Sequence, residues 1–124
     1  FAVPCCQHEL YAQLKTRKET FRTEDHLLRP LMEHGIITER FASLLTDTVR
    51  ALLLQACGYT VQIMEFIETE HTPKNILIHA VKKTQSAGQA DRLKTTALGQ
   101  YRRLKESFRI EPTLEKLLHY AVSE

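Results

Sequence analysis

The spacing of hydrophobic and polar residues predicts one long amphipathic helix in the middle of the chain. Apolar side chains recur between residues 38 and 58 at the 3.6-residue period of a helix that buries one face. Thr38 is a plausible N-cap, and Gly58 occupies the position after the last turn, where glycine commonly ends a helix. The predicted inward positions are Phe41, Leu44, Leu45, Thr48, Val49, Leu52, Leu53 and Ala56.

Four weaker helical patterns flank this segment. One covers residues 8–18, and a second begins at residue 23 or 24 and ends at Gly35, with Pro30 predicting a kink or a late start. A basic amphipathic helix is predicted over residues 90–106, and Pro112 suits the first position of a last helix. The predicted inward positions of the basic helix are Leu93, Ala97, Leu98, Tyr101 and Leu104.

Three segments lack the helical period and predict strands. Residues 59–67 are rich in β-branched and aromatic side chains, and residues 76–81 are almost continuously apolar, which is typical of a strand buried on both faces. A polar loop over residues 68–75 joins them, so they are expected to pair antiparallel. Residues 1–3 predict a short opening strand. The order strand, helices, strand, strand, helices indicates an α/β fold that looks like half of a doubly wound sheet.

Composition narrows the class of protein. The chain has 124 residues, enough for one domain, and its 43% hydrophobic and 26% charged residues are typical of globular proteins. No apolar run approaches the roughly 20 residues of a membrane helix, and no signal-peptide pattern opens the chain. Three cysteines, two of them adjacent, do not form a disulfide framework, so a cytoplasmic location is predicted.

Charge is distributed unevenly along the chain. Residues 72–109 contain nine lysines and arginines against two acidic residues, whereas the whole chain has a formal net charge of only +2. Such asymmetry is typical of a surface that faces a polyanion such as RNA. The alternative is a solvated basic helix face.

The loop after the opening strand carries the densest candidate chemistry. Pro4-Cys5-Cys6-Gln7-His8-Glu9 places two thiols, an imidazole and a carboxylate where open α/β sheets bind ligands. Adjacent cysteines diverge in an extended segment, and only Cys57 and His71 are distant additions, so no metal site is predicted. Two alternatives remain for Cys5 and Cys6: a thiolate activated at a helix start, or packing residues beside a helix that His8 and Glu9 cap.

A second candidate is the loop His71-Thr72-Pro73-Lys74-Asn75 between the two later strands. Its proline fixes a bend that can present His71, Lys74 and Asn75 to a substrate. The alternative is a simple turn stabilised by Pro73 and by local hydrogen bonds of Asn75.

The two loops together resemble a family. Val3-Pro4-Cys5-Cys6-Gln7-His8-Glu9-Leu10 is similar to the VPCCxHEL signature of a group of class I S-adenosylmethionine-dependent methyltransferases, which includes methyltransferase-like and ribosomal-RNA-adenine-dimethylase-domain proteins. Residues 58–67 and 70–78 are similar to the same group's GYxVxxxEF and HTPKNxLI patterns, although His79 stands where arginine is expected. The resemblance covers nearly the whole chain and corresponds to the C-terminal half of the methyltransferase domain.

That resemblance implies a fold and an activity. The fold is the C-terminal part of a Rossmann-like sheet: strand 5, helices, and an antiparallel hairpin of strands 6 and 7 within residues 1–85, then a C-terminal helical extension over 86–124. The transferase would use S-adenosylmethionine, with RNA methylation as its expected reaction. Pro4 would border the cofactor; the implied catalytic residues are Cys5, Cys6, His8 and Glu9, and the implied substrate-binding residues are His71, Lys74 and Asn75.

It also implies that this half lacks the main cofactor site. The four glycines are isolated, so the chain has no Gly-rich phosphate or cofactor loop, and the fragment alone is expected to be inactive. The edge of the opening strand is expected to allow a homodimer. The alternative function is a non-catalytic helical module that binds a partner or a nucleic acid.

Overall fold

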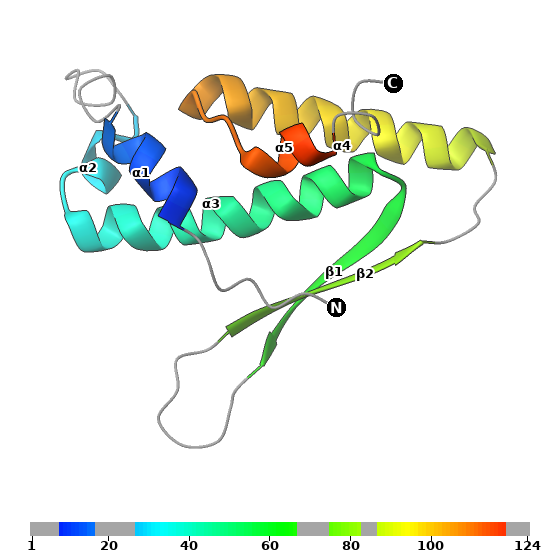
Figure 1. Cartoon of the computed structure of the whole chain (residues 1–124), viewed down its shortest axis with the longest axis horizontal. Helices are drawn as coiled ribbons and strands as arrows, with labels where there is room; N and C mark the ends of the chain where they lie inside the picture. The colour runs from blue at the N-terminus through cyan, green and yellow to red at the C-terminus, as the bar shows by residue number, and fades with distance from the viewer. Residues whose placement is uncertain (1–7, 17–26, 67–74, 83–86, 119–124) are drawn as a thin grey trace.

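Two long helices and one hairpin form the framework of the protein. The computed structural model describes residues 8–16, 27–66, 75–82 and 87–118. Helices α3 and α4 run antiparallel to each other, the hairpin contacts α3, and the short helices pack around this pair (Figure 1). The elements are α1 (His8–Thr16), α2 (Arg29–Met32), α3 (Gly35–Ala56), β1 (Tyr59–Phe66), β2 (Asn75–Lys82), α4 (Ala87–Phe108) and α5 (Thr113–Leu117).

The predicted central helix is confirmed, but its start was placed wrongly. α3 begins at Gly35, which was expected to end the preceding helix, and its N-cap is His34. Thr38 lies inside the first turn, where its hydroxyl donates to the carbonyl oxygens of Leu31 at 3.2 Å and His34 at 3.0 Å. The prediction of Thr38 as N-cap is therefore wrong, because its side chain binds carbonyl groups and not the free N–H groups of the helix start. Gly58 ends the helix as predicted, with a φ of +93°.

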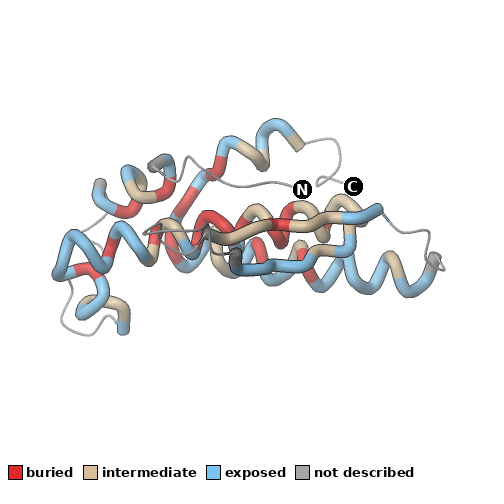
Figure 2. The backbone as a smooth tube through the Cα atoms, turned by 90° about the horizontal axis from the view of Figure 1, so that it is seen from below, coloured by how far each residue is buried: buried red, intermediate tan, exposed pale blue. Residues whose placement is uncertain are grey.

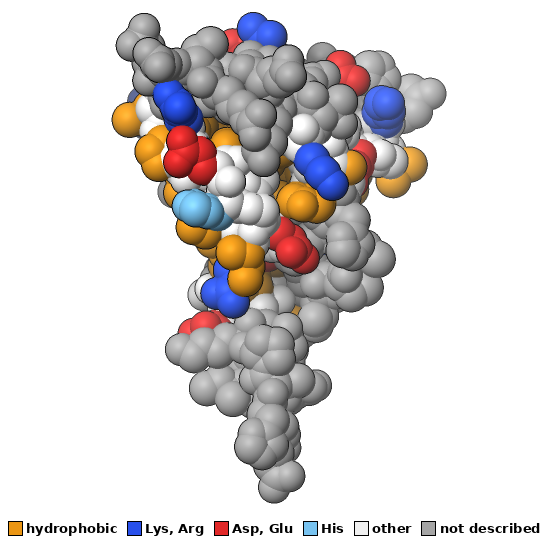
Figure 3. All heavy atoms as spheres, turned by 90° about the vertical axis from the view of Figure 1, so that its left-hand side faces the viewer, with side chains coloured by type: hydrophobic (Ala, Val, Ile, Leu, Met, Phe, Trp, Pro, Cys, Tyr) orange, Lys and Arg blue, Asp and Glu red, His pale blue; other side chains and the backbone are white. Residues whose placement is uncertain are grey.

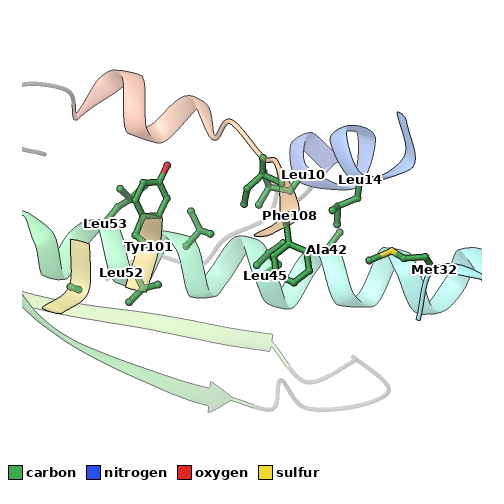
Figure 4. Close-up of a cluster of buried hydrophobic side chains, with 12 residues drawn as sticks. Leu10, Leu14, Met32, Ala42, Leu45, Leu52, Leu53, Tyr101 and Phe108 are labelled. Carbon is green, nitrogen blue, oxygen red and sulfur yellow. The ribbon is translucent and has the colours of Figure 1, made fainter. Parts of the chain in front are cut away.

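The core lies where α1, α3 and α4 meet. Tyr101 and Phe108 of α4 pack with Leu45 and Leu53 of α3, and the ring centroids of Phe41 and Phe108 are 5.3 Å apart (Figure 4). Burial is concentrated along this seam (Figure 2). The largest fully buried side chains are Tyr101, Leu10, Leu14, Met32, Leu53, Ile78, Ile110 and Val49.

Three residues that the helical period placed inside are exposed: Leu44, Thr48 and Leu93. Thr48 lies one turn after Leu44 on the same side of α3, and its hydroxyl donates to the carbonyl oxygen of Leu44 at 2.8 Å. Leu44 is 57% exposed, because it lies on a side of α3 that none of the described elements covers. Leu93 is 52% exposed, since the first turns of α4 project past the end of α3 (Figure 1). A helical period identifies an apolar face, but the position of the neighbouring helix decides how much of it is buried.

The hairpin confirms both later strands and their antiparallel pairing. Its register runs from Tyr59 opposite Lys82 to Phe66 opposite Asn75. The expected burial of the second strand on both faces is wrong: Ile78 is buried, whereas Val81 is 40% exposed. Within the described part of the chain, helix α3 covers one face of this two-stranded sheet and no other element covers the opposite face. The fold is thus mixed α/β with a two-stranded antiparallel sheet, and the predicted opening strand over residues 1–3 lies outside the described residues.

The connection from α4 to α5 is tight. Arg109 has a φ of +51°, and the N–H of Ile110 donates to the carbonyl of Lys105 at 3.2 Å. This bond and the left-handed residue are the C-terminal cap that usually employs glycine. Pro112 was predicted at the first position of the last helix, but it is the N-cap of α5, so the helix begins one residue later, at Thr113. The buried Ile110 fixes this connection to the core.

Candidate functional site

The residues of the opening loop are placed only in part. Pro4, Cys5 and Cys6 lie outside the described residues, and His8 is described as the first residue of α1 without its side chain. Their predicted roles as cofactor-binding or catalytic residues stay predictions. Glu9 is the one member of the loop whose side-chain contacts are described.

Glu9 contacts the start of the last helix. Its Oε1 accepts hydrogen bonds from the backbone N–H of Thr113 at 2.8 Å and from the Thr113 hydroxyl at 2.5 Å. Pro112, the N-cap of α5, offers no side-chain hydrogen bond, so Glu9 supplies the anionic cap from a distant part of the chain. The hydrogen bonds of Glu9 therefore cap α5, while its place in the first turn of α1 also suits the considered role at the start of that helix.

Gln13, one turn further along α1, extends this contact. Its Nε2 donates to the carbonyl oxygen of Glu111 at 3.0 Å, and its Oε1 accepts from the N–H of Glu111 at 2.7 Å. With the two bonds of Glu9, four hydrogen bonds join α1 to the start of α5; we call Glu9, Gln13, Glu111 and Thr113 the α1–α5 latch. The latch fixes the helix that follows the Cys5–Cys6 loop.

Replacement of Glu9 by alanine is expected to lower the free energy of unfolding by about 1–2 kcal/mol, because the substitution removes a charged helix cap. Urea unfolding followed by circular dichroism measures the change. Glu39→Ala removes an exposed acid from the first turns of α3 and is the control, with an expected change within about 0.5 kcal/mol. Equal effects of the two substitutions would contradict the capping role.

The loop between the later strands is described at one residue only. His71 and Lys74 lie outside the described residues, and Asn75 begins β2, where its backbone pairs with Phe66. The closing pair of the hairpin is thus adjacent to the predicted substrate loop. Substrate contacts of His71, Lys74 and Asn75 stay predictions.

A polar cluster on the inner side of α4 was missed from the sequence. The buried Tyr101 donates its hydroxyl to Oε2 of Glu115 at 2.6 Å, and Nζ of Lys105 lies 2.8 Å from the same oxygen. Burial, then the hydrogen bond and the charge of Glu115, raise the pKa of Tyr101 far above its ordinary value. Tyr101 therefore stays protonated and acts as a donor that joins α4 to α5.

Two open cavities border the C-terminal half of α4. One, of about 710 Å³, has mixed charge, and the other, of about 620 Å³, is mostly apolar. Both volumes are within the range of small-molecule sites. The first is lined by Arg102, Lys105, Glu106, Arg109, Ile110, Glu111 and Glu115, and the second by Leu27, Leu28, Thr48, Leu52, Gln100, Arg103, Leu104, Ser107 and Phe108.

Apolar and charged side chains also share the surface at the end of the molecule that carries α2 and the start of α3. Ile36 and Ile37 are exposed there at the start of α3, after the exposed Leu31 of α2. Figure 3 views this end and shows orange hydrophobic side chains interspersed with blue and red charged ones. The described part of this end therefore presents a mixed surface.

Thiol and metal chemistry are limited within the described ranges. Burial raises the pKa of the Cys57 thiol, and the positive charge of Lys94 opposes this in part. Cys57 is thus less often a thiolate than an exposed cysteine. No group of three or more His, Cys, Asp or Glu side chains within residues 8–16, 27–66, 75–82 and 87–118 is arranged to hold a metal ion. No described helix has the length and apolar character needed to cross a membrane.

Comparison with protein-family models, with curated protein sequences and with solved structures gives no match. The resemblance to class I methyltransferases therefore depends on the residues quoted for it, in the loop that begins at Pro4 and in the segment from Gly58 to Ile78.

Proposed function

We propose that this chain supplies the substrate-side half of an S-adenosylmethionine-dependent methyltransferase, with RNA as the substrate class. The observation that carries the proposal is the β1–β2 hairpin, which follows helix α3 and is antiparallel. The implied methyltransferase half has the same order: a helix, then two antiparallel neighbouring strands. The quoted GYxVxxxEF segment covers β1, which begins at its tyrosine, and β2 begins at Asn75, the last residue of the HTPKN segment.

The exposure of the hairpin also supports this proposal. A two-stranded sheet is marginally stable by itself, and strands of α/β sheets are usually covered on both faces. Ile63 and Met64 are neighbours in β1, so their side chains point to opposite faces of the hairpin. Ile63 is nevertheless 52% exposed and Met64 38% exposed. Such apolar strand residues fit a hairpin that continues a larger sheet.

The described residues do not form a cradle for the cofactor. Gly35, Gly88 and Gly99 lie within helices, and Gly58 ends one, so none belongs to a Gly-rich turn after a strand. We therefore assign no cofactor contact to the described part of the chain. In the proposal, the cofactor is held mainly by another part of the enzyme, and Pro4 borders it.

In this scheme the opening loop holds the methyl acceptor. Cys5 and Cys6 would line its pocket, and His8 or Glu9 would hold or deprotonate it, while His71, Lys74 and Asn75 contact the substrate from the hairpin loop. When bound, the cofactor supplies an electrophilic methyl group, so these residues mainly orient the acceptor toward it. A reducing cytoplasm and a dimer through the opening strand are further parts of the proposal.

Calorimetric titration with S-adenosylmethionine tests the proposal. The full-length protein is expected to bind saturably, and the Pro4→Ala/Cys5→Ala/Cys6→Ala variant to lose binding. Cys57→Ala is the matched control, since it removes a thiol outside the loop and should retain binding. The isolated 124-residue chain is expected to bind weakly or not at all. Absence of saturable binding by the full-length protein would refute the proposal, and tight binding by the isolated chain would refute the division into two halves.

The second candidate is a non-catalytic module that binds nucleic acid. The observation that favours it is the exposed arginines of α4, which require no cofactor to bind phosphate. Binding of RNA by a full-length protein that does not bind S-adenosylmethionine would favour this candidate.

A further inference from the structure

We infer that Arg92, Arg102 and Arg103, on the outward side of α4, bind the phosphate backbone of single-stranded RNA. We call these residues the arginine face. The inference names the part of the chain that holds the substrate in the proposed function, and it rests on that proposal for the choice of RNA. The sequence predicted RNA binding by the whole basic segment over residues 72–109; the inference assigns it to these three side chains.

The structure separates the basic residues of α4 by their surroundings. Lys105 is bound to Glu115, so it cannot bind an external anion without loss of that ion pair. Lys94 is exposed, but it lies on the inner side of the helix, beside Gln55, Gly58 and Tyr59. Neither lysine belongs to the outward side of α4.

The arginines have no such contacts. Arg92, Arg102 and Arg103 are exposed, and none of them has an ion pair with any residue in the described part of the chain. Arg109 is also exposed, but it follows the last residue of α4 and forms the left-handed turn toward α5, so it is not part of the arginine face. Arg102 lies at the edge of this face, where it borders the mixed-charge cavity that also contains Glu106 and Glu111.

The spacing of the three arginines suits an extended polyanion. Arg92 and Arg103 are eleven positions apart, or three helical turns, so they lie on one side of α4 about 16 Å apart along its axis. The stretch between them contains no acidic residue, and its outward positions are small or uncharged: Thr95, Thr96, Gly99 and Gln100. A chain with a phosphate at each residue can lie along this side and meet positive charge at both ends.

The polarity of α4 favours a nucleic acid over a membrane surface. A helix that binds a membrane inserts an apolar face, whereas Ala97, Tyr101 and Phe108 of α4 are buried in the core. The outward side of α4 carries the arginines, and the apolar face that a membrane would need is buried against the core. Arginine also matches phosphate better than lysine does, because its planar guanidinium can donate two hydrogen bonds at once.

The test is the salt dependence of RNA binding, measured by fluorescence anisotropy with the full-length protein and a labelled 20-nucleotide oligouridine. Each phosphate contact contributes about −0.7 to the slope of log affinity against log salt, so three contacts predict a slope of about −2. Affinity is then expected to fall roughly 20-fold between 50 and 200 mM salt. The Arg92→Gln/Arg102→Gln/Arg103→Gln variant is expected to bind at least about tenfold more weakly at 50 mM, with a slope near zero.

A matched variant removes equal charge elsewhere. Lys15→Gln/Arg40→Gln/Lys116→Gln changes three exposed basic residues of α1, α3 and α5 and is expected to keep the wild-type slope. Thermal unfolding checks that both variants fold, since exposed substitutions change stability by about 0.5 kcal/mol or less. S-adenosylmethionine titration of the arginine variant is expected to match the wild type, which separates this inference from the proposed function.

Three results would overturn the inference. The first is no RNA binding by the wild-type protein at 50 mM salt. The second is an equal loss of affinity in both triple variants, which would assign binding to overall charge. The third is arginine-dependent binding to vesicles with anionic lipids without binding to RNA, which would make a membrane surface the partner.

Discussion

Replacement of Tyr101 by alanine is expected to lower the free energy of unfolding by about 3–5 kcal/mol, the cost of removing a fully buried aromatic ring. Tyr101 is 1% exposed and packs against α3 within the cluster that includes Leu53. The substitution also removes the donor to Glu115, which ties α4 to α5. Urea unfolding measures the loss, which is a large fraction of the stability of an ordinary domain.

Two matched variants show which part of Tyr101 matters. Tyr101→Phe keeps the ring and removes the hydroxyl, and is expected to cost about 1–2 kcal/mol, because Lys105 still binds Glu115. Leu93→Ala removes a half-exposed side chain from the same helix and is expected to cost less than about 1 kcal/mol. A Tyr101→Ala variant as stable as Leu93→Ala would contradict the packing of α4 on α3.

The same residue gives stability a pH dependence. Burial and Glu115 raise the pKa of Tyr101 in the folded state. Above about pH 10, the unfolded chain releases the phenol proton while the folded chain keeps it, so the folded state loses stability as pH rises. This contribution falls by at most about 1.4 kcal/mol per pH unit. The stability difference between wild type and Tyr101→Phe should therefore shrink between pH 9 and pH 11, and parallel curves would contradict the raised pKa.

Local patterns in the sequence were sufficient to predict the framework. The helical period located α3 and α4, the change to β-branched residues located the hairpin, and Gly58 marked the end of α3. Helices, strands and helix ends can be predicted in this way because they depend on residues that are close together in the sequence. The start of α3 was misplaced because threonine can cap a helix or, as Thr38 does, bind carbonyl groups inside its first turn.

Contacts between distant segments could not be predicted in this way. Glu9 was identified as a candidate residue, but its partner Thr113 lies 104 positions away and no pattern joins them. The same holds for the exposure of Leu44, which depends on where the hairpin and α4 lie against α3. For the arginine face, a signal was present: the helical period of α4 already separates Arg92 and Arg103 from the inward Lys94 and Lys105.

Replacement of Gly58 by alanine is expected to lower the free energy of unfolding by about 1–3 kcal/mol. Gly58 has a φ of +93°, which residues with a side chain rarely adopt, and it turns the chain from α3 into β1. An added Cβ would also lie 3.0 Å from Cε of Lys94. Strain at this position therefore weakens the junction that holds the hairpin against α3, and urea unfolding measures the loss.

A second glycine provides the control for Gly58. Gly99 lies in the exposed interior of α4, and a Cβ there would meet nothing within 4 Å. Gly99→Ala is therefore expected to raise the free energy of unfolding by up to about 1 kcal/mol, since alanine favours the helix. The Gly58→Ala/Lys94→Ala double variant separates the two causes: backbone strain predicts that most of the loss persists without the lysine. Full recovery in the double variant would assign the loss to the Lys94 contact, and a stabilised Gly58→Ala variant would contradict the left-handed turn between α3 and β1.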